Sequence, residues 1–153
     1  MSEDFARFVG LTINRSPWAC WNRECYHLSK ALERLIRSYA ALRSGDRGSL
    51  LDNLGATISS VNQARVDENL KNYLRGLIAL YMEKVALAQP DELRRAIDDL
   101  LSRESRSSRD LGRWLADALG RAPAEEAKLQ VMEKIIGELE KTLLRCVLEC
   151  ATR

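Results

Sequence analysis

Apolar residues recur every three or four positions between Trp21 and Leu42, the spacing that keeps side chains on one face of an α-helix. The residues in this set are Trp21, Cys25, Leu28, Leu32, Leu35, Tyr39 and Leu42. Just before them, Ser16 can cap a helix, and Pro17 suits the first helical position because no backbone N–H is needed there. The pattern therefore predicts one continuous helix from Pro17 to about Arg43.

The same segment carries a second, basic set of residues, shifted by two positions from the apolar set. Its members are Arg23, His27, Lys30, Arg34 and Arg37. Because a helix turns by about 100° per residue, a shift of two positions places the basic set roughly opposite the apolar one. The predicted helix is thus amphipathic, with one face for a protein core and one cationic face.

Caps and apolar spacing predict helices along the rest of the chain as well. The expected spans are 3–13, 49–59, 64–88, 90–101, 109–120 and 124–151. Ser2, Ser49 and Ser108 are the expected caps of the helices that begin at 3, 49 and 109. Between the helices, "SVNQ" is expected to be a polar link and "SRESRSS" a loop or frayed turn.

Signals for β-structure are missing from the sequence. It contains no β-branched run of alternating polarity, no Asn-Gly or Asp-Gly hairpin turn and no internal repeat. The sequence therefore predicts an all-α fold, a helical bundle of six or seven helices in a single domain, 1–153. Its two long helices, about 17–43 and 124–151, are expected to pack together.

Composition and charge agree with a globular protein and narrow the function only a little. The 153 residues are 46% hydrophobic and 30% charged, and the net charge is +2, so no global field demands nucleic acid. The 18 arginines against 6 lysines indicate either a GC-rich or thermophilic source or a preference for bidentate contacts with phosphate or carboxylate groups. The surface of mixed charge suits a heat-adapted protein. Without a membrane-span pattern or a secretory leader pattern in the sequence, the expected location is the cytoplasm.

The four cysteines form two pairs, Cys20 with Cys25 and Cys146 with Cys150, in strongly helical sequence. One interpretation is four buried thiols, which behave as small apolar side chains. A second is one or two disulfides that join the two long helices, a feature found in proteins of hyperthermophiles. A third is a metal site with His27 as a substitute ligand, although structural zinc sites usually hold each pair on a tight knuckle. In all three cases the two long helices meet near these residues.

Catalytic and cofactor motifs are scarce. The sequence contains neither a Gly-x-x-x-x-Gly-Lys-Ser/Thr phosphate loop nor a Gly-x-Gly-x-x-Gly turn, and no cofactor is expected. Arg23 and His27, four apart on one predicted helical face, resemble the arginine–histidine motif of HEPN-type helical ribonucleases, in which histidine serves as acid or base. That family generally has four to six residues between the two, whereas this chain has three. A non-enzymatic protein is therefore the expectation.

Two basic features remain to be explained. The first is the stripe of Arg23, Lys30, Arg34 and Arg37, whose spacing can follow a phosphate backbone. The second is a ridge of Arg103, Arg106, Arg109 and Arg113 beside Trp114. Cations for phosphates and aromatic rings for bases are the combination that single-stranded nucleic-acid binders use. The alternative is that both are the ordinary polar faces of amphipathic helices in an arginine-rich chain.

The stretch "SYAALRSGDRGSLLDNLGATIS", from Ser38 to Ser59, resembles part of a known family. It is similar to the helix–turn–helix core of the type I-A small subunit of archaeal CRISPR effector complexes, in which a short "LLDxL-A" helix follows a polar turn. This resemblance implies a protein that packs beside a larger subunit and contacts displaced or guide-paired nucleic acid through basic side chains.

Together these patterns predict a non-enzymatic, nucleic-acid-associated accessory subunit of a larger ribonucleoprotein assembly. The expected partners are a larger protein subunit and single-stranded or guide-paired nucleic acid, with a homo-oligomer also open and no membrane. The first alternative is a protein-interaction or oligomerisation module, whose arginines pair with acids on a partner. The second is a HEPN-like ribonuclease that uses Arg23 and His27.

Overall fold

The computed structural model describes residues 14–153, which form seven helices and no strand. The all-α fold predicted from the sequence is thereby confirmed. The helices are α2 (Pro17–Asn22), α3 (Tyr26–Ser44), α4 (Arg47–Gln63), α5 (Glu68–Lys84), α6 (Pro90–Ser102), α7 (Arg106–Leu119) and α8 (Ala124–Ala151). The helix predicted over 3–13, with its cap at Ser2, lies outside the described residues.

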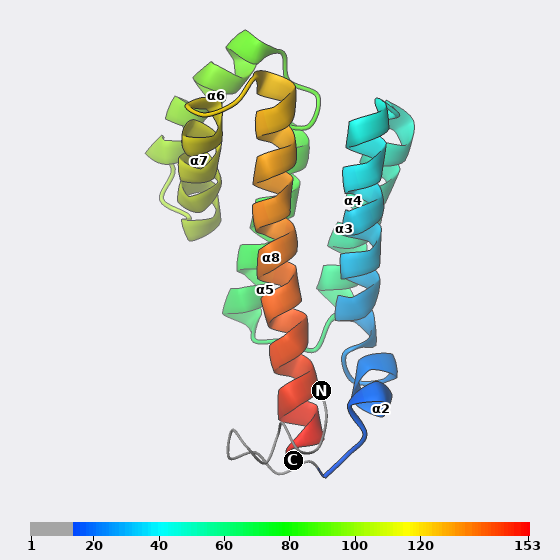
Figure 1. Cartoon of the computed structure of the whole chain (residues 1–153). Helices are drawn as coiled ribbons and strands as arrows, with labels where there is room; N and C mark the ends of the chain where they lie inside the picture. Colours follow the sequence, from blue (N-terminus) through cyan, green and yellow to red (C-terminus); the bar gives the residue numbers. More distant parts are fainter. Residues whose placement is uncertain (1–13) are drawn as a thin grey trace.

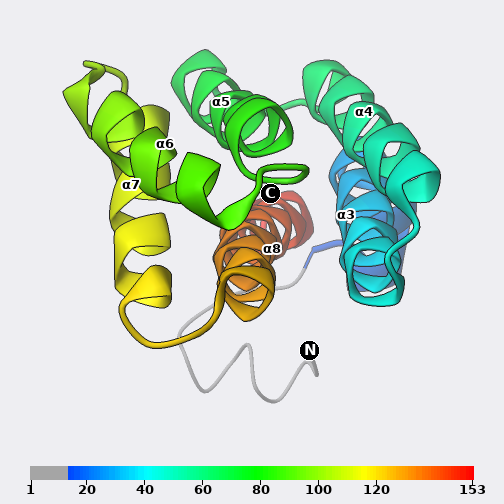
Figure 2. The same ribbon diagram turned by 90° about the horizontal axis from the view of Figure 1, so that it is seen from above.

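Helix α8 runs along the length of the molecule and is the element around which the others are arranged (Figure 1). The pairs α3–α4 and α6–α7 flank it on opposite sides, and α5 lies between the two pairs (Figure 2). The short α2 packs against the C-terminal end of α8. The prediction of a long helix over 124–151 is confirmed with the same bounds, and this helix packs against α3 as expected.

The core is made of the apolar faces that the sequence spacing predicts. The central α5 buries one broad face, and its buried residues are Tyr73, Leu74, Leu77, Ile78 and Tyr81. The Tyr81 hydroxyl donates a hydrogen bond of 2.7 Å to the backbone oxygen of Lys128 on α8. At Gly76 a Cβ atom would lie only 2.4 Å from Ser107 Oγ, so the glycine permits the close approach of α5 and α7.

The helix predicted over 49–59 is longer at both ends in the structure. It begins at Arg47 because Asp46, and not Ser49, is its cap, and the Asp46 carboxylate accepts a hydrogen bond from the Ser49 backbone N–H at 3.1 Å. The helix continues through "SVNQ" to Gln63, so the prediction of a link there is wrong. The reason is Val61, which continues the buried face of α4 and anchors this turn in the core.

Two other helix starts differ from the prediction. Helix α5 begins at Glu68 and not at 64, because Asp67 accepts from the backbone N–H of Leu70 and caps it. Helix α7 begins at Arg106, capped by Ser105 and not by Ser108. The Ser108 hydroxyl is instead buried and donates to the backbone oxygen of Leu100 on α6, which fixes the α6–α7 pair.

Candidate functional site

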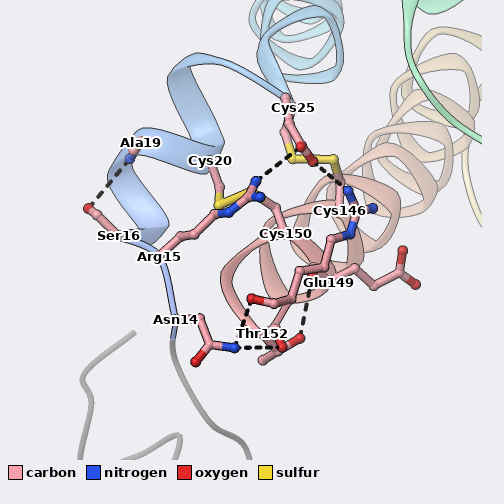
Figure 3. Close-up of a disulfide and its surroundings, with 12 residues drawn as sticks. Asn14, Arg15, Ser16, Ala19, Cys20, Cys25, Cys146, Glu149, Cys150 and Thr152 are labelled. Carbon is pink, nitrogen blue, oxygen red and sulfur yellow. Dashed lines mark hydrogen bonds and ion pairs between the residues drawn. A yellow bond between two sulfur atoms is a disulfide. The ribbon is translucent and has the colours of Figure 1, made fainter.

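The prediction of one continuous helix from Pro17 to Arg43 is wrong, and the four cysteines lie at the break. Helix α2 ends at Asn22, residues 23–25 form a turn, and α3 begins at Tyr26. Two disulfides join this region to α8, Cys20 with Cys150 and Cys25 with Cys146 (Figure 3). Of the alternatives open in the sequence, the structure therefore has disulfides, and its sulfur atoms are neither free thiols nor metal ligands.

The break follows from the spacing of the cysteines. Cys146 and Cys150 are four apart and lie on one face of α8, whereas Cys20 and Cys25 are five apart. Five residues on a continuous helix turn by about 500°, which leaves the two side chains about 140° apart. Both cysteines can reach the same face of α8 only if the chain turns between them, as it does at 23–25.

Polar contacts fix the same region to the end of α8. The backbone N–H groups of Asn14 and Arg15 both donate to the carbonyl oxygen of Ala151, at 2.6 and 3.1 Å. Glu24, in the turn, accepts from Arg15 at 3.2 Å and from Arg153 at 3.0 Å. The backbone around α2 is therefore held on α8 by two disulfide bonds and by the hydrogen bonds of Asn14 and Arg15 to the carbonyl of Ala151 (Figure 3).

This rigid end of the molecule exposes aromatic rings. Trp18 is 75% exposed, Trp21 40% and Tyr26 42%, and the two tryptophans are three apart on one side of α2. Next to them in the chain, Lys30 lies 5.6 Å above the Tyr26 ring. We call the segment from Trp18 to Lys30 the aromatic end; its aromatic and basic residues are Trp18, Trp21, Arg23, Tyr26, His27 and Lys30.

The tryptophans were not recognised as functional candidates in the sequence. The sequence pattern places Trp21 in the apolar stripe of the predicted continuous helix. The break between α2 and α3 removes it from that stripe. The available signal was the mismatch between the five-residue and four-residue cysteine spacings. Large exposed aromatic residues that lie together typically mark an interaction site.

The basic stripe on α3 is partly neutralised. Lys30 and Arg37 both pair with Glu33, at 3.2 and 2.8 Å, and the hydrogen bond and charge of Lys30 lower the pKa of Glu33. Such exposed pairs add little stability and exchange readily for other partners. Arg34 and Arg23 have no acidic partner among residues 14–153.

The ridge on α7 is more strongly engaged with its own acids. Arg106 lies 3.6 Å from the Asp110 carboxylate, Arg113 donates to the same group, and Arg103 pairs with Asp99 at 3.0 Å. Arg109 is exposed and donates through Nε to the backbone oxygen of Arg103.

Asp110, which pairs with Arg106 and Arg113, is also hydrogen-bonded to Tyr73 on α5. The buried Asp110 accepts a hydrogen bond of 2.6 Å from the Tyr73 hydroxyl, and burial together with this bond raises the pKa of Tyr73. Arg106 also stacks over the Tyr73 ring at 4.3 Å. Trp114, beside the ridge in the sequence, is packed against the core. Its position favours the reading of this ridge as a polar helix face.

The two arginine sets lie on different parts of the molecule. Arg106, Arg109 and Arg113 of the ridge lie on α7, with Arg103 at the end of α6. Lys30, Arg34 and Arg37 of the stripe lie on α3, and α3 and α7 flank α8 on opposite sides (Figure 2). The structure therefore does not bring the two predicted cation sets into one groove. It places the α3 stripe next to the aromatic end instead.

The ribonuclease alternative requires Arg23 and His27 on one face of a single helix, and the structure does not place them so. Arg23 follows the last residue of α2, and His27 lies in the first turn of α3. The two residues are therefore not on one face of one helix. Within the part of the chain that the structure describes, no cluster of histidine, cysteine, aspartate and glutamate suits a metal ion.

Comparison with known proteins gives no relative from which a site could be transferred. No family model, no curated protein and no solved structure matches the chain. None of the helices between residues 14 and 153 is long and apolar enough to cross a membrane.

Proposed function

We propose that this protein is a non-enzymatic accessory subunit that binds single-stranded nucleic acid at the aromatic end and along the adjoining α3 stripe. The observation that carries the proposal is the exposure of Trp18 and Trp21 on a helix that the Cys20–Cys150 disulfide joins to α8, with Arg23 directly after that helix in the chain. Lys30 follows on α3, over the Tyr26 ring. Rings stack on bases and cations pair with phosphates, and these are the two parts of sequence-tolerant single-strand binding.

The local charge supports this choice of partner. Glu24 is the acid nearest to Arg23 in the sequence, and it is engaged by Arg15 and Arg153. Glu33 pairs with two cations of the stripe, Lys30 and Arg37. One acid among these cations and Arg34 leaves the stripe with an excess of positive charge. A polyanion gains from such a surface because its condensed counterions are released on binding.

The exposed rings favour a single strand over a duplex. In a duplex the faces of the bases are already stacked on one another, whereas an open strand offers its bases to protein rings. A surface held in one conformation also loses little conformational entropy on binding. Under this proposal the α7 ridge is a structural feature of the α6–α7 pair and contributes no base contacts.

The role as a subunit of a larger assembly rests on the resemblance of Ser38–Ser59 to the small subunits of archaeal CRISPR complexes. That segment forms the end of α3, a turn at Gly45 and most of α4. A larger protein subunit and a displaced or guide-paired strand are accordingly the proposed partners. Two disulfides are compatible with the proposed cytoplasmic location in a hyperthermophile, whose intracellular proteins retain such bonds.

A protein-interaction or oligomerisation module is the second candidate, and the same tryptophans favour it. Tryptophan is enriched among the residues that dominate the binding energy of protein interfaces. Exposed Ile36 and Leu144 add apolar surface on α3 and α8. Under this alternative the isolated protein self-associates through these residues, and it binds nucleic acid of neither kind.

A salt titration of binding tests the proposed function. The fluorescence anisotropy of labelled single and double strands should show about micromolar affinity for the single strand at low salt, falling as salt rises. Arg34→Gln should reduce the magnitude of the slope of log K against log salt by about 0.7, the value for one single-strand phosphate contact.

The matched control is Arg94→Gln, an exposed arginine on α6 at the far end of the molecule from α2 (Figure 1). Its slope should equal that of the unaltered protein. Failure to bind either strand at low salt, together with a mass that rises with protein concentration, would support the interaction module instead.

A further inference from the structure

A groove lies beside one of the two disulfides, between the start of α5 and the C-terminal half of α8. It has a volume of about 640 Å³ and opens to solvent. Cys146 is among its lining residues, together with Val66, Leu70 and Thr142 and a group of charged side chains. None of these residues is a proposed contact of the nucleic acid, although the Cys25–Cys146 bond helps to hold the aromatic end in place.

The two disulfides differ in access. Cys20, Cys150 and Cys25 are buried, with exposed fractions of 2%, 1% and 0%. Cys146 alone is partly exposed, and it faces the groove. A reagent in solution can therefore reach the Cys25–Cys146 bond from the Cys146 side, while the Cys20–Cys150 bond is enclosed between α2 and α8.

The groove lining holds four cations and three acids. Its cations are Arg65, Lys71, Arg145 and Arg153, and its acids are Glu24, Asp67 and Glu149. Arg153 is paired with Glu24, and Lys71 with Glu68 outside the groove lining. Arg145 directly precedes Cys146 and has no acidic partner among residues 14–153. Glu149 lies one turn further along α8 and lines the same groove, but it makes no direct ion pair with Arg145. An anionic group close to Cys146 can therefore pair with the Arg145 guanidinium.

We propose that this groove is a site for small anionic thiols, which open the Cys25–Cys146 disulfide by exchange at Cys146. The thiolate attacks the Cys146 sulfur, a bond forms between the two, and the Cys25–Cys146 bond breaks. Cys25 leaves as a thiolate and takes a proton from solvent. A second thiolate then attacks the small-molecule sulfur, which releases a small disulfide and the Cys146 thiolate. Two thiols are oxidised as one protein disulfide is reduced.

The Cys20–Cys150 disulfide remains intact through this exchange. It keeps α2 on α8, together with the hydrogen bonds of Asn14 and Arg15 to Ala151. The site is thus a covalent modification site on an otherwise folded protein. It does not depend on nucleic-acid binding.

Three thiols of equal size and different charge test the proposal on the native, oxidised protein without nucleic acid. They are 2-mercaptoethanesulfonate, 2-mercaptoethanol and cysteamine, whose second group is negative, neutral and positive. Samples are quenched with acid, the new thiols are alkylated, and mass spectrometry of peptides gives the rate for each cysteine. Each rate is divided by the rate of the same thiol with a small neutral disulfide, which removes differences in thiolate fraction and nucleophilicity.

Cys25 and Cys146 should be released well before Cys20 and Cys150, with the transient thiol adduct on Cys146. The normalised rate should be about three- to tenfold higher for the anionic thiol than for the cationic one at low salt, and this ratio should shrink as salt rises. Arg145→Gln should lower the ratio, whereas Arg94→Gln should leave it unchanged. Release of Cys20 and Cys150 first, or of all four cysteines together, overturns the assignment of the bridge. Equal normalised rates for all three thiols overturn the anion site.

Discussion

Removal of both disulfides should lower the free energy of unfolding by about 7 to 8 kcal/mol, although removal of either one alone should cost only about 3 kcal/mol. The reason is that the two bridges are nested. Cys20–Cys150 spans 130 residues and Cys25–Cys146 spans 121. The first bridge to form therefore removes the entropy of a very long loop, worth about 5 kcal/mol in the chain-entropy description.

The second bridge closes a much smaller circuit. Once Cys25 and Cys146 are joined, Cys20 and Cys150 are separated by only the five and four residues that lead to that bond. A loop of about ten residues is worth about 3 kcal/mol. Either bridge can be treated as the second one to form. Removal of one bridge alone therefore lowers the free energy of unfolding only by the smaller contribution of about 3 kcal/mol.

The measurement is urea unfolding of three variants. They are Cys20→Ala with Cys150→Ala, Cys25→Ala with Cys146→Ala, and all four substitutions together. Alanine is used at every position so that buried polar groups are not introduced. Because domains of ordinary stability unfold with about 5 to 15 kcal/mol, the fourfold variant should be marginal or unfolded at room temperature. A fourfold variant whose loss equals the sum of the two double variants would show that the loops are not coupled.

Replacement of Trp18 and Trp21 by alanine should weaken single-strand binding by about 2 to 6 kcal/mol, a factor of about 30 to 20,000, because each stacked base contributes about 1 to 3 kcal/mol. Trp18 is mostly exposed, Trp21 is 40% exposed, and the Cys20–Cys150 bond holds the backbone between them, so the fold should be retained. Anisotropy with a labelled single strand gives the affinity, and the thermal midpoint checks the fold.

The matched controls separate ring stacking from apolar surface in general. Leu101→Ala removes a similarly exposed apolar side chain at the end of α6 and should leave the affinity unchanged. Trp18→Phe keeps an aromatic face and should retain most of the binding. An alanine double variant that binds the strand as tightly as the unaltered protein would exclude the aromatic end as the contact surface.

Local signals in the sequence predicted the elements that local chemistry determines. The span of α8 follows from Pro123 and an apolar stripe repeated over many turns, and the span of α6 from Pro90 and the acids after it. The extension of α4 was missed because its last apolar anchor, Val61, is isolated among polar residues in "SVNQ". Its burial is a property of the assembled bundle.

The break between α2 and α3 has no local signal, because Cys25 fits the apolar stripe by its spacing. Only the mismatch with the four-residue spacing of Cys146 and Cys150, more than a hundred residues away, indicates that the chain must turn there if both pairs are bridged. Arginine positions were predicted from spacing in the same way. Several of these arginines form ion pairs with acids three or four residues away, as Arg106 and Arg113 do with Asp110.

The emission of Trp18 and Trp21 during a titration with an unlabelled single strand tests the central claim most directly. The protein has three tryptophans, and Trp114→Phe removes the third, which packs against the core. If bases stack on the aromatic end, the emission of this variant should be quenched and should saturate at the same strand concentration as the anisotropy. Unchanged emission while the anisotropy reports a bound strand would contradict the account.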